Sequence, residues 1–343
     1  MTHKLSQRIK GPQAASLGDI KSLTFRDWWH LTARYTSVVE TRETIGIAMK
    51  IMAHRGFRHL PVVSDGNLSG IITAGDLINT FTSVDLTKMK ARDSSIEDTS
   101  KRESEKIISS LNLHVEDVKS SQPVSIKASA TILDAIRLMS EKNIGSLLIV
   151  EDEAEKQMGS RHGTRLLGIV TLRDIISILS AYGPFGIRVE DCMTRRVATT
   201  NERNSIYSAM ELMAREGVRR LPVVAMTRNR DSGEAVLGMV TNKMILRYLE
   251  SVISYNMVDM EKGVIQPVKT VMHPSMPSID PKEDCGNAAY LMRELGTGGF
   301  AVIDSRELVG VITERDLVRR IYEKEGLSFF TDLFGMGNGR MQI

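Results

Sequence analysis

The sequence has little of what marks a secreted, membrane-spanning or nucleic-acid-binding chain. Its 343 residues contain only two cysteines, Cys192 and Cys285, which excludes a disulfide framework and gives no metal-ligand spacing. No apolar run approaches the roughly 18 residues that cross a bilayer, and residues 1–10 lack the apolar stretch of a secretory signal. The formal charge of +3, with short basic clusters only, argues against a nucleic-acid partner. We therefore expect a cytoplasmic protein without membrane contact.

Motifs of catalysis are also missing. The sequence contains no phosphate loop of the form G-x-x-x-x-G-K-[ST], no H-E-x-x-H pair and no G-x-S-x-G elbow. Five histidines stand in unrelated positions, at residues 30, 54, 114, 162 and 273, and an isolated histidine is more often structural than catalytic. We expect neither an enzyme nor a metal or cofactor site.

What the sequence does contain is one short motif, written four times. Each copy begins with a glycine, two apolar residues and a threonine, and three copies place an aspartate three residues after the threonine. These three are Gly70-Ile-Ile-Thr73-Ala-Gly-Asp76, Gly168-Ile-Val-Thr171-Leu-Arg-Asp174 and Gly310-Val-Ile-Thr313-Glu-Arg-Asp316. The remaining copy, Gly238-Met-Val-Thr241-Asn-Lys-Met244, has methionine in place of the acid. Such repetition indicates a duplicated structural unit.

The residues upstream of the motif repeat in a fixed register. Each copy has a helix-like stretch with Ala-x-x-x-Met, and an apolar strand begins eight residues after that methionine. The strands are Leu60-Pro-Val-Val63, Leu147-Leu-Ile-Val150, Leu221-Pro-Val-Val224 and Phe300-Ala-Val-Ile303. A second strand ends at the threonine, and an amphipathic segment follows it. The periodicities together predict a β-α-β-β-α unit.

The apolar "LPVV" strand and the G-h-h-T-x-x-D ending (h apolar) resemble the CBS domain. The resemblance implies an α/β (α+β) fold in which four CBS repeats pair into two Bateman modules, at about 17–183 and 184–325, with ligand clefts between paired repeats. A chain of four repeats is most similar to the regulatory γ subunit of the AMP-activated protein kinase and its archaeal relatives. We divide the chain into an N-terminal extension (1–16), CBS repeats 1 to 4 (17–83, 115–183, 184–254 and 255–325), a polar helical insertion or linker (84–114) and a C-terminal tail (326–343).

The threonine and the aspartate of the motif have two interpretations. Thr-x-x-Asp at the start of a helix is nearly a capping box, which satisfies free backbone N–H groups and needs no ligand. The resemblance implies instead aspartates that bind a ribose and threonines that bind near phosphate at a helix N-terminus. The aspartates are Asp76, Asp174 and Asp316, and the threonines are Thr73, Thr171 and Thr313. Both interpretations can hold at once.

The residues just before each apolar strand, here called the strand entrance, differ between copies. Copies one and three have basic pairs, whereas copies two and four have Gly145-Ser146 and Gly298-Gly299. The basic pairs are Arg58-His59 and Arg219-Arg220. Such pairs often mark a solvated strand edge, but the resemblance implies that these four side chains bind phosphates. It also implies that the entrance backbone binds adenine, at Phe57, Ile144 and Val218.

In the resembling family, a cleft combines the strand entrance of one repeat with the threonine and aspartate of its partner. We therefore expect Arg58 and His59 to face Thr171 and Asp174. The second basic pair, Arg219 and Arg220, should face Thr313 and Asp316. The cleft of Asp76, opposite residues 144–146, can hold adenosine, with charges of the other module as phosphate partners. The cleft of Met244 lacks a ribose acceptor, so we expect it to be empty or to bind something without a ribose.

Our leading hypothesis is a regulatory sensor of AMP, ADP or ATP that acts by conformational change on a partner, such as a kinase or another regulated enzyme. The alternatives are a CBS regulator of another adenosyl ligand (S-adenosylmethionine) or of nucleic acid, and an enzyme acting on nucleotides. Trp28 and Trp29 predict packing on the first module or a partner-binding patch. Three phenylalanines in the tail, Phe329, Phe330 and Phe334, predict docking on the tail's own module, on a second copy in a homodimer, or on another protein.

Overall fold

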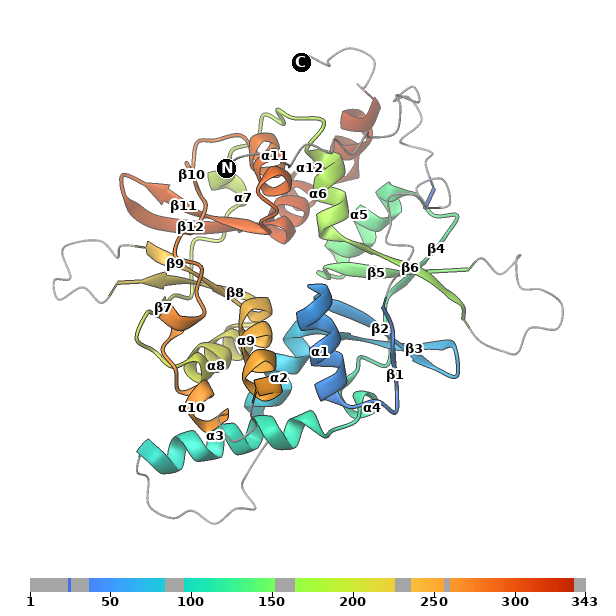
Figure 1. The fold of residues 1–343 in the computed structure, drawn as a ribbon. Coiled ribbons are helices and arrows are strands. Elements are labelled where there is room, and N and C mark those ends of the chain that lie inside the picture. Colours follow the sequence, from blue (N-terminus) through green and yellow to red (C-terminus); the bar gives the residue numbers. More distant parts are fainter. Residues whose placement is uncertain are drawn as a thin grey trace, which may run out of the picture.

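Four units of the predicted type make up the protein. The structure, a computed structural model, describes residues 24–25, 37–83, 96–151, 164–225, 236–255 and 260–335. Trp28 and Trp29 lie outside these ranges. Figure 1 shows the four repeats arranged around a common centre. Each repeat has a sheet of three strands and two helices, in the order β-α-β-β-α, so the predicted fold class is confirmed.

The elements follow the sequence register closely. Repeat 1 comprises β1 (Val39–Glu40), α1 (Ile45–Arg55), β2 (His59–Ser64), β3 (Asn67–Thr73) and α2 (Ala74–Ser83). Repeat 2 comprises β4 (Ser125–Lys127), α5 (Ile132–Glu141), β5 (Ser146–Val150), β6 (Leu166–Thr171) and α6 (Leu172–Leu179). Repeat 3 comprises β7 (Thr200–Asn201), α8 (Ile206–Glu216), β8 (Arg220–Val224), β9 (Val236–Thr241) and α9 (Asn242–Tyr255). Repeat 4 comprises β10 (Ser278–Ile279), α11 (Cys285–Glu294), β11 (Gly299–Asp304), β12 (Glu307–Thr313) and α12 (Glu314–Gly335).

All four sheets have the same topology. The apolar strand lies in the middle, parallel to the first strand and antiparallel to the strand that ends at the threonine. The middle strands are almost wholly buried, as with Leu60 and Val62 at 0% exposure, because helices cover one face and neighbouring repeats the other. Such two-sided burial explains why these strands read as continuous apolar runs rather than as alternating ones.

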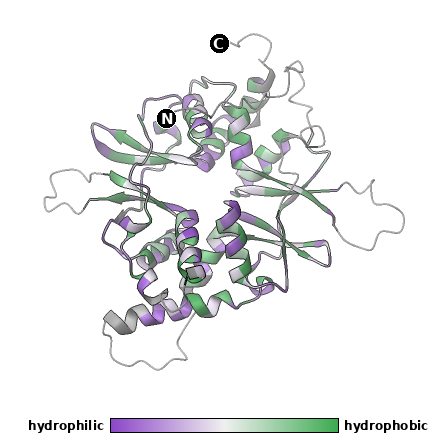
Figure 2. Cartoon of the chain, viewed as in Figure 1, coloured by the Kyte–Doolittle hydropathy of each residue, from purple (hydrophilic) through white to green (hydrophobic). Residues whose placement is uncertain are grey.

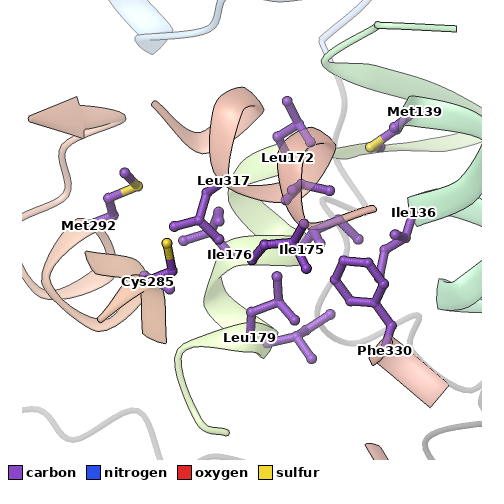
Figure 3. Packing of buried hydrophobic residues seen from close by; sticks show 14 of the residues in the cluster. Ile136, Met139, Leu172, Ile175, Ile176, Leu179, Cys285, Met292, Leu317 and Phe330 are labelled. Carbon is purple, nitrogen blue, oxygen red and sulfur yellow. The ribbon is translucent and has the colours of Figure 1, made fainter. Parts of the chain in front are cut away.

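The helices build two hydrophobic cores, and each core joins repeats of different modules. Helices α1 and α2 of repeat 1 pack against α9 and α8 of repeat 3, and α5 and α6 of repeat 2 pack against α12 and α11 of repeat 4. Figure 3 shows the second core, where Ile176 of α6, Leu317 of α12 and Cys285 of α11 gather. The two modules are therefore held together by their main cores.

Short segments before the first strands fasten the repeats within a module. Val115, Val189 and Val268 each stand eleven residues before a residue of the next first strand, and they lie in α4 (Val115–Val118), α7 (Val189–Cys192) and a short 3₁₀ turn (Val268–Thr270). We call residues 115–124, 189–199 and 268–277 the pre-strand segments. Each forms a β-bridge to the edge of a partner sheet. The bridged pairs are Ser120 with Ile71, Thr194 with Val311, and His273 with Met239.

These bridges explain the glycine in three of the four copies of the repeated motif, Gly70, Gly238 and Gly310. A Cβ atom on Gly310 would lie 3.0 Å from the carbonyl oxygen of Thr194, and one on Gly70 would lie 2.5 Å from that of Ser120. Gly238 meets the carbonyl oxygen of His273 in the same way. The glycine is thus required by a close approach of backbone rather than by a turn.

The insertion and the tail both pack on the molecule. The insertion contains α3 (Ile96–Leu111), as predicted, but it is not fully solvated, because Ile107 at 0% and Leu111 at 7% exposure enter the core of repeats 1 and 3. Helix α3 lies beside α10 (Met260–Val264) and α2. Helix α12 breaks at Gly326, and its last part brings Phe330 (0% exposed) into the core of repeats 2 and 4. We expected the tail to dock on its own module, on a second copy or on another protein. Phe330 docks on its own module.

Candidate functional site

The threonine–aspartate pairs form helix caps. The N–H of the threonine donates to Oδ2 of the aspartate at 2.7 Å in Thr73–Asp76, 2.7 Å in Thr171–Asp174 and 3.0 Å in Thr313–Asp316. In the copy that lacks the acid, only the reverse bond remains, from the N–H of Met244 to the hydroxyl oxygen of Thr241 at 3.3 Å. The capping interpretation is confirmed. Because a cap uses one carboxylate oxygen, the other stays available for a further donor.

The starts of these helices have few free donors. In each repeat, the first residue of the second helix donates its N–H to the carbonyl oxygen of its own strand entrance, at distances of 2.9–3.1 Å. The donor–acceptor pairs are Ala74–Arg58, Leu172–Gly145, Asn242–Arg219 and Glu314–Gly298. We expected helix N–H groups and threonine hydroxyls to bind phosphate. Since the caps and these bonds occupy most of them, recognition of a phosphate falls mainly on basic side chains.

A cavity of about 190 Å³ lies between repeats 3 and 4. Helix α8 ends at Glu216, and Gly217, with a φ of 63°, turns the chain into the strand entrance, so that Val218, Arg219 and Arg220 line the cavity. Thr313 and Asp316 of repeat 4 line it as well. The structure therefore brings together the entrance of repeat 3 and the motif of repeat 4. Apolar side chains complete the lining; they include Val197, Ala198, Pro222 and Val311.

The pre-strand segment 189–199 also contributes to this cavity, and our sequence reasoning missed it. The hydroxyl of Thr194 donates to Oδ1 of Asp316 at 3.2 Å, the oxygen that the cap leaves available. Thr194, Arg196, Val197 and Ala198 all line the cavity. A signal existed in the sequence, because Val115, Val189 and Val268 precede the first strands at equal spacing.

The glycines at the entrances of repeats 2 and 4 leave room for the arginines of repeat 3. A Cβ atom on Gly298 would lie 2.7 Å from Nη2 of Arg220, and one on Gly145 would lie 3.2 Å from Nη1 of Arg219. The two kinds of entrance are therefore complementary. Burial and neighbouring arginines lower the pKa of Arg219 to about 10. Burial lowers the pKa of Arg220 to about 10 as well, so both side chains carry a charge at neutral pH.

The other basic pair is placed differently from our expectation. Arg58 donates to Glu314 of repeat 4 at 3.3 Å and lines the cavity of Asp316. Among the described residues it makes no hydrogen bond or ion pair to Thr171 or Asp174. Burial, with Arg219 and Arg58 nearby, lowers the pKa of His59 to about 3. This histidine is therefore neutral, and it would meet a phosphate as a hydrogen-bond donor rather than as a cation.

A second cavity, of about 120 Å³, lies at Asp76. Its lining includes Thr73, Asp76 and Asn79 of repeat 1 and Arg219 and Asn242 of repeat 3. Arg219 thus borders both cavities. A charge from the other module stands beside Asp76, as we expected, but residues 144–146, which we expected opposite Asp76, do not line this cavity.

The remaining predicted residues lie in packed surroundings. Burial raises the pKa of the Asp174 carboxyl, although the hydrogen bonds from Thr171 act in the opposite direction. Phe57 and Ile144 are partly buried side chains that pack against the two cores. Val218 borders both cavities. In the part of the chain that the structure describes, no group of three or more His, Cys, Asp or Glu could hold a metal ion, and no helix is long and apolar enough to cross a membrane.

The family follows from comparison with known proteins. The CBS domain family matches residues 34–83, 115–181, 189–251 and 268–323, so the chain belongs to this family. Its members are regulatory ligand-binding modules. With four repeats, this protein further resembles the γ subunit of the AMP-activated protein kinase.

Individual relatives match most of the length of the chain. An uncharacterized 33.4 kDa protein in a ribosomal RNA operon of Thermofilum pendens is 27% identical over 301 residues, 86% of this chain and 91% of the relative. Uncharacterized protein MJ1225 of Methanocaldococcus jannaschii is 24% identical over 282 residues, 80% of this chain and 91% of the relative. The crystal structure of MJ1225, proposed to be an archaeal homologue of g-AMPK, covers 85% of this chain and 98% of its own, with a TM-score of 0.67 and 23% identity. A conserved Pyrococcus horikoshii protein aligns over 84% and 96%, with a TM-score of 0.51 and 19% identity. These structural likenesses show a common fold.

Proposed function

We propose that the protein is a regulatory sensor of adenine nucleotides and that the cavity between repeats 3 and 4 binds the nucleotide. The observation that carries the proposal is that one carboxylate, Asp316, and two partly buried arginines, Arg219 and Arg220, line the same cavity. A nucleotide has a diol that needs an acceptor, phosphates that need cations, and a base that needs an apolar slot.

The residues that line the cavity include a group for each of these three needs. Oδ1 of Asp316 accepts a hydrogen bond from the hydroxyl of Thr194, and a ribose hydroxyl would take the place of that donor. The apolar side chains of Val218, Pro222 and Val311 would contact the adenine. The guanidinium groups of Arg219 and Arg220 would bind phosphate oxygens through charge-assisted hydrogen bonds. Ligand binding would then change how repeats 3 and 4 meet, and a partner protein such as a kinase would sense that change.

The direct test is calorimetric titration of the full chain with adenosine, AMP, ADP, ATP and S-adenosylmethionine. We expect the nucleotides to bind more tightly than adenosine, because only they reach both arginines. Tight binding of S-adenosylmethionine with no binding of nucleotides would replace this proposal with the other adenosyl ligand. Absence of binding by all five compounds would refute an adenosine-type site. A signal that requires turnover of ATP would point to an enzyme.

A further inference from the structure

One carboxylate near the centre of the molecule is surrounded by arginines from the other three repeats. Glu314, the first residue of α12, is 5% exposed. Its carboxylate accepts hydrogen bonds from Arg58 of repeat 1 at 3.3 Å and from Arg173 of repeat 2 at 3.0 Å. Arg220 of repeat 3 lies beside it, since its guanidinium and the Glu314 carboxylate both lie against Gly298. Figure 2 shows hydrophilic stretches on the helix ends that meet around this centre.

The carboxylate is charged and faces the cavity. Burial alone would raise the pKa of Glu314, but Arg58, Arg173 and Arg220 lower it. Glu314 lines the same cavity as Arg58, Arg219 and Arg220. An anionic group of a ligand that bound these arginines would therefore compete with the Glu314 carboxylate for the same guanidinium groups.

The helix start does not require an acid at this position. The corresponding residues of the other three repeats are Ala74, Leu172 and Asn242, and each makes the same N–H bond to its strand entrance as Glu314 does. The cap is made by the neighbouring threonine and aspartate in repeats 1, 2 and 4 alike. The acidic side chain is thus an addition specific to repeat 4, whose motif lines the larger of the two cavities.

We propose that Glu314 is an internal competitor for ligand phosphates and that it limits how many phosphates the cavity accepts. This inference rests on the proposed nucleotide site. A single phosphate would be held mainly by Arg219, whose side chain has no hydrogen bond or ion pair among the described residues. Each further phosphate would need the other cavity arginines, Arg58 and Arg220, where it must displace the Glu314 carboxylate and is repelled by it. Glu314 therefore favours a monophosphate over a triphosphate.

The variant Glu314→Gln removes the charge and keeps the shape. We expect this variant to bind ATP at least about tenfold more tightly than the wild type, a gain of about 1.4 kcal/mol. The gain for AMP should be smaller, and adenosine should bind equally to both proteins. Glu307→Gln is a matched control, because Glu307 is an exposed carboxylate on β12 and its removal changes the net charge equally. Glu314→Asp keeps the charge and should keep the preference for AMP.

Calorimetry with adenosine, AMP, ATP and inorganic tripolyphosphate, below the melting temperature of every variant, gives the result. If Glu314→Gln binds ATP no better than the wild type, or gains equally for AMP and ATP, Glu314 only ties the repeats together and the inference is wrong. Such a result leaves nucleotide binding by the wild type intact as a proposal. If no protein binds a nucleotide but Glu314→Gln binds tripolyphosphate more tightly than the wild type, Glu314 competes with anions and the adenine site is wrong.

Discussion

Asp316 shows how one side chain serves both a cap and a ligand. Its Oδ2 accepts bonds from the N–H and the hydroxyl of Thr313, at 3.0 Å and 2.6 Å, and from the described residues its Oδ1 accepts only the hydroxyl of Thr194. The Asp134 carboxylate makes the same cap with Thr131 at the start of α5, but it lines neither cavity. The two aspartates therefore separate the structural role from the binding role.

We expect Asp316→Asn to weaken binding of AMP by about tenfold to a hundredfold, because the ribose hydroxyls lose a charged acceptor. Its melting temperature should fall only slightly, since an amide oxygen still accepts from Thr313. Asp134→Asn is the control, because it changes the same kind of cap, and it should lower the melting temperature by a similarly small amount with no change in affinity. Calorimetry and thermal melts measure the two effects separately. Equal affinity in all three proteins would leave Asp316 as a cap alone.

The neutral state of His59 has a consequence for stability at low pH. Its pKa is about 3 in the folded protein, against about 6.5 in an unfolded chain. Between these two pH values His59 is protonated in the unfolded chain but neutral in the folded protein. Protonation therefore favours unfolding, and the free energy of unfolding falls as the pH drops from about 6.5 toward 3. We expect the melting temperature of the wild type to fall more steeply than that of His59→Gln over this range. Parallel curves for the two proteins would contradict the burial of a neutral imidazole.

At the scale of elements, the pre-strand segments link the fold to the cavity. The backbone of Thr194 pairs with Val311 next to Gly310, while its side chain reaches Asp316. One short segment therefore fixes both the edge of the sheet and a wall of the cavity. A change that displaces this segment should affect stability and binding together.

The variant Gly310→Ala tests this link, because its Cβ would press on Met193 and on the carbonyl of Thr194. We expect a loss of about 1–3 kcal/mol in stability, as for overpacked sites, together with weaker nucleotide binding. Gly75→Ala is the control, since its Cβ meets nothing closer than the Thr73 hydroxyl oxygen at 3.5 Å and alanine favours the helix. Thermal melts and AMP titrations of both variants suffice. An unchanged melting temperature of Gly310→Ala would show that the pre-strand segment can move away from the added Cβ without loss of stability, which would contradict the prediction.

At the scale of the whole molecule, the cores determine what can fold alone. Each core draws helices from both modules, as with Ile245 of α9 beside the repeat 1 residues Ile45 and Leu77. Separating residues 1–183 from 184–343 would expose the apolar faces of several helices at once. We expect either half alone to aggregate or self-associate, and the two halves to co-purify when expressed together. Size-exclusion chromatography measures the association state of each half, and far-UV circular dichroism measures its folding. Two folded, monomeric halves would contradict the prediction.

The residue pattern predicted local structure, whereas the meeting of the repeat 3 entrance with the repeat 4 motif was predicted only through the resemblance to the CBS family. Equal spacing of the motif residues defined the strands, the helices and the caps, since these depend on neighbours within a few positions. The ion pairs of Glu314 join residues 256 and 141 positions apart, and no periodicity reports such contacts. For the same reason Thr194 was missed at Asp316, and so was the burial of Ile107 of α3 in the core of repeats 1 and 3. The position of Arg58 was expected from the resemblance alone, and no pattern in the sequence indicates its ion pair with Glu314.

Arg219 stands between two cavities, and this position shapes any response to concentration. Within the described residues its side chain has no hydrogen bond or ion pair, yet it borders the cavities of both Asp316 and Asp76. A first anion bound in either cavity would neutralise the charge of Arg219, and a second anion in the other cavity would then be attracted less strongly. Occupancy of one cavity would lower the affinity of the other, which is negative cooperativity. The dose–response curve would then be shallower than that of a single site, so the protein would register its ligand over a wide range of concentrations instead of switching at one threshold.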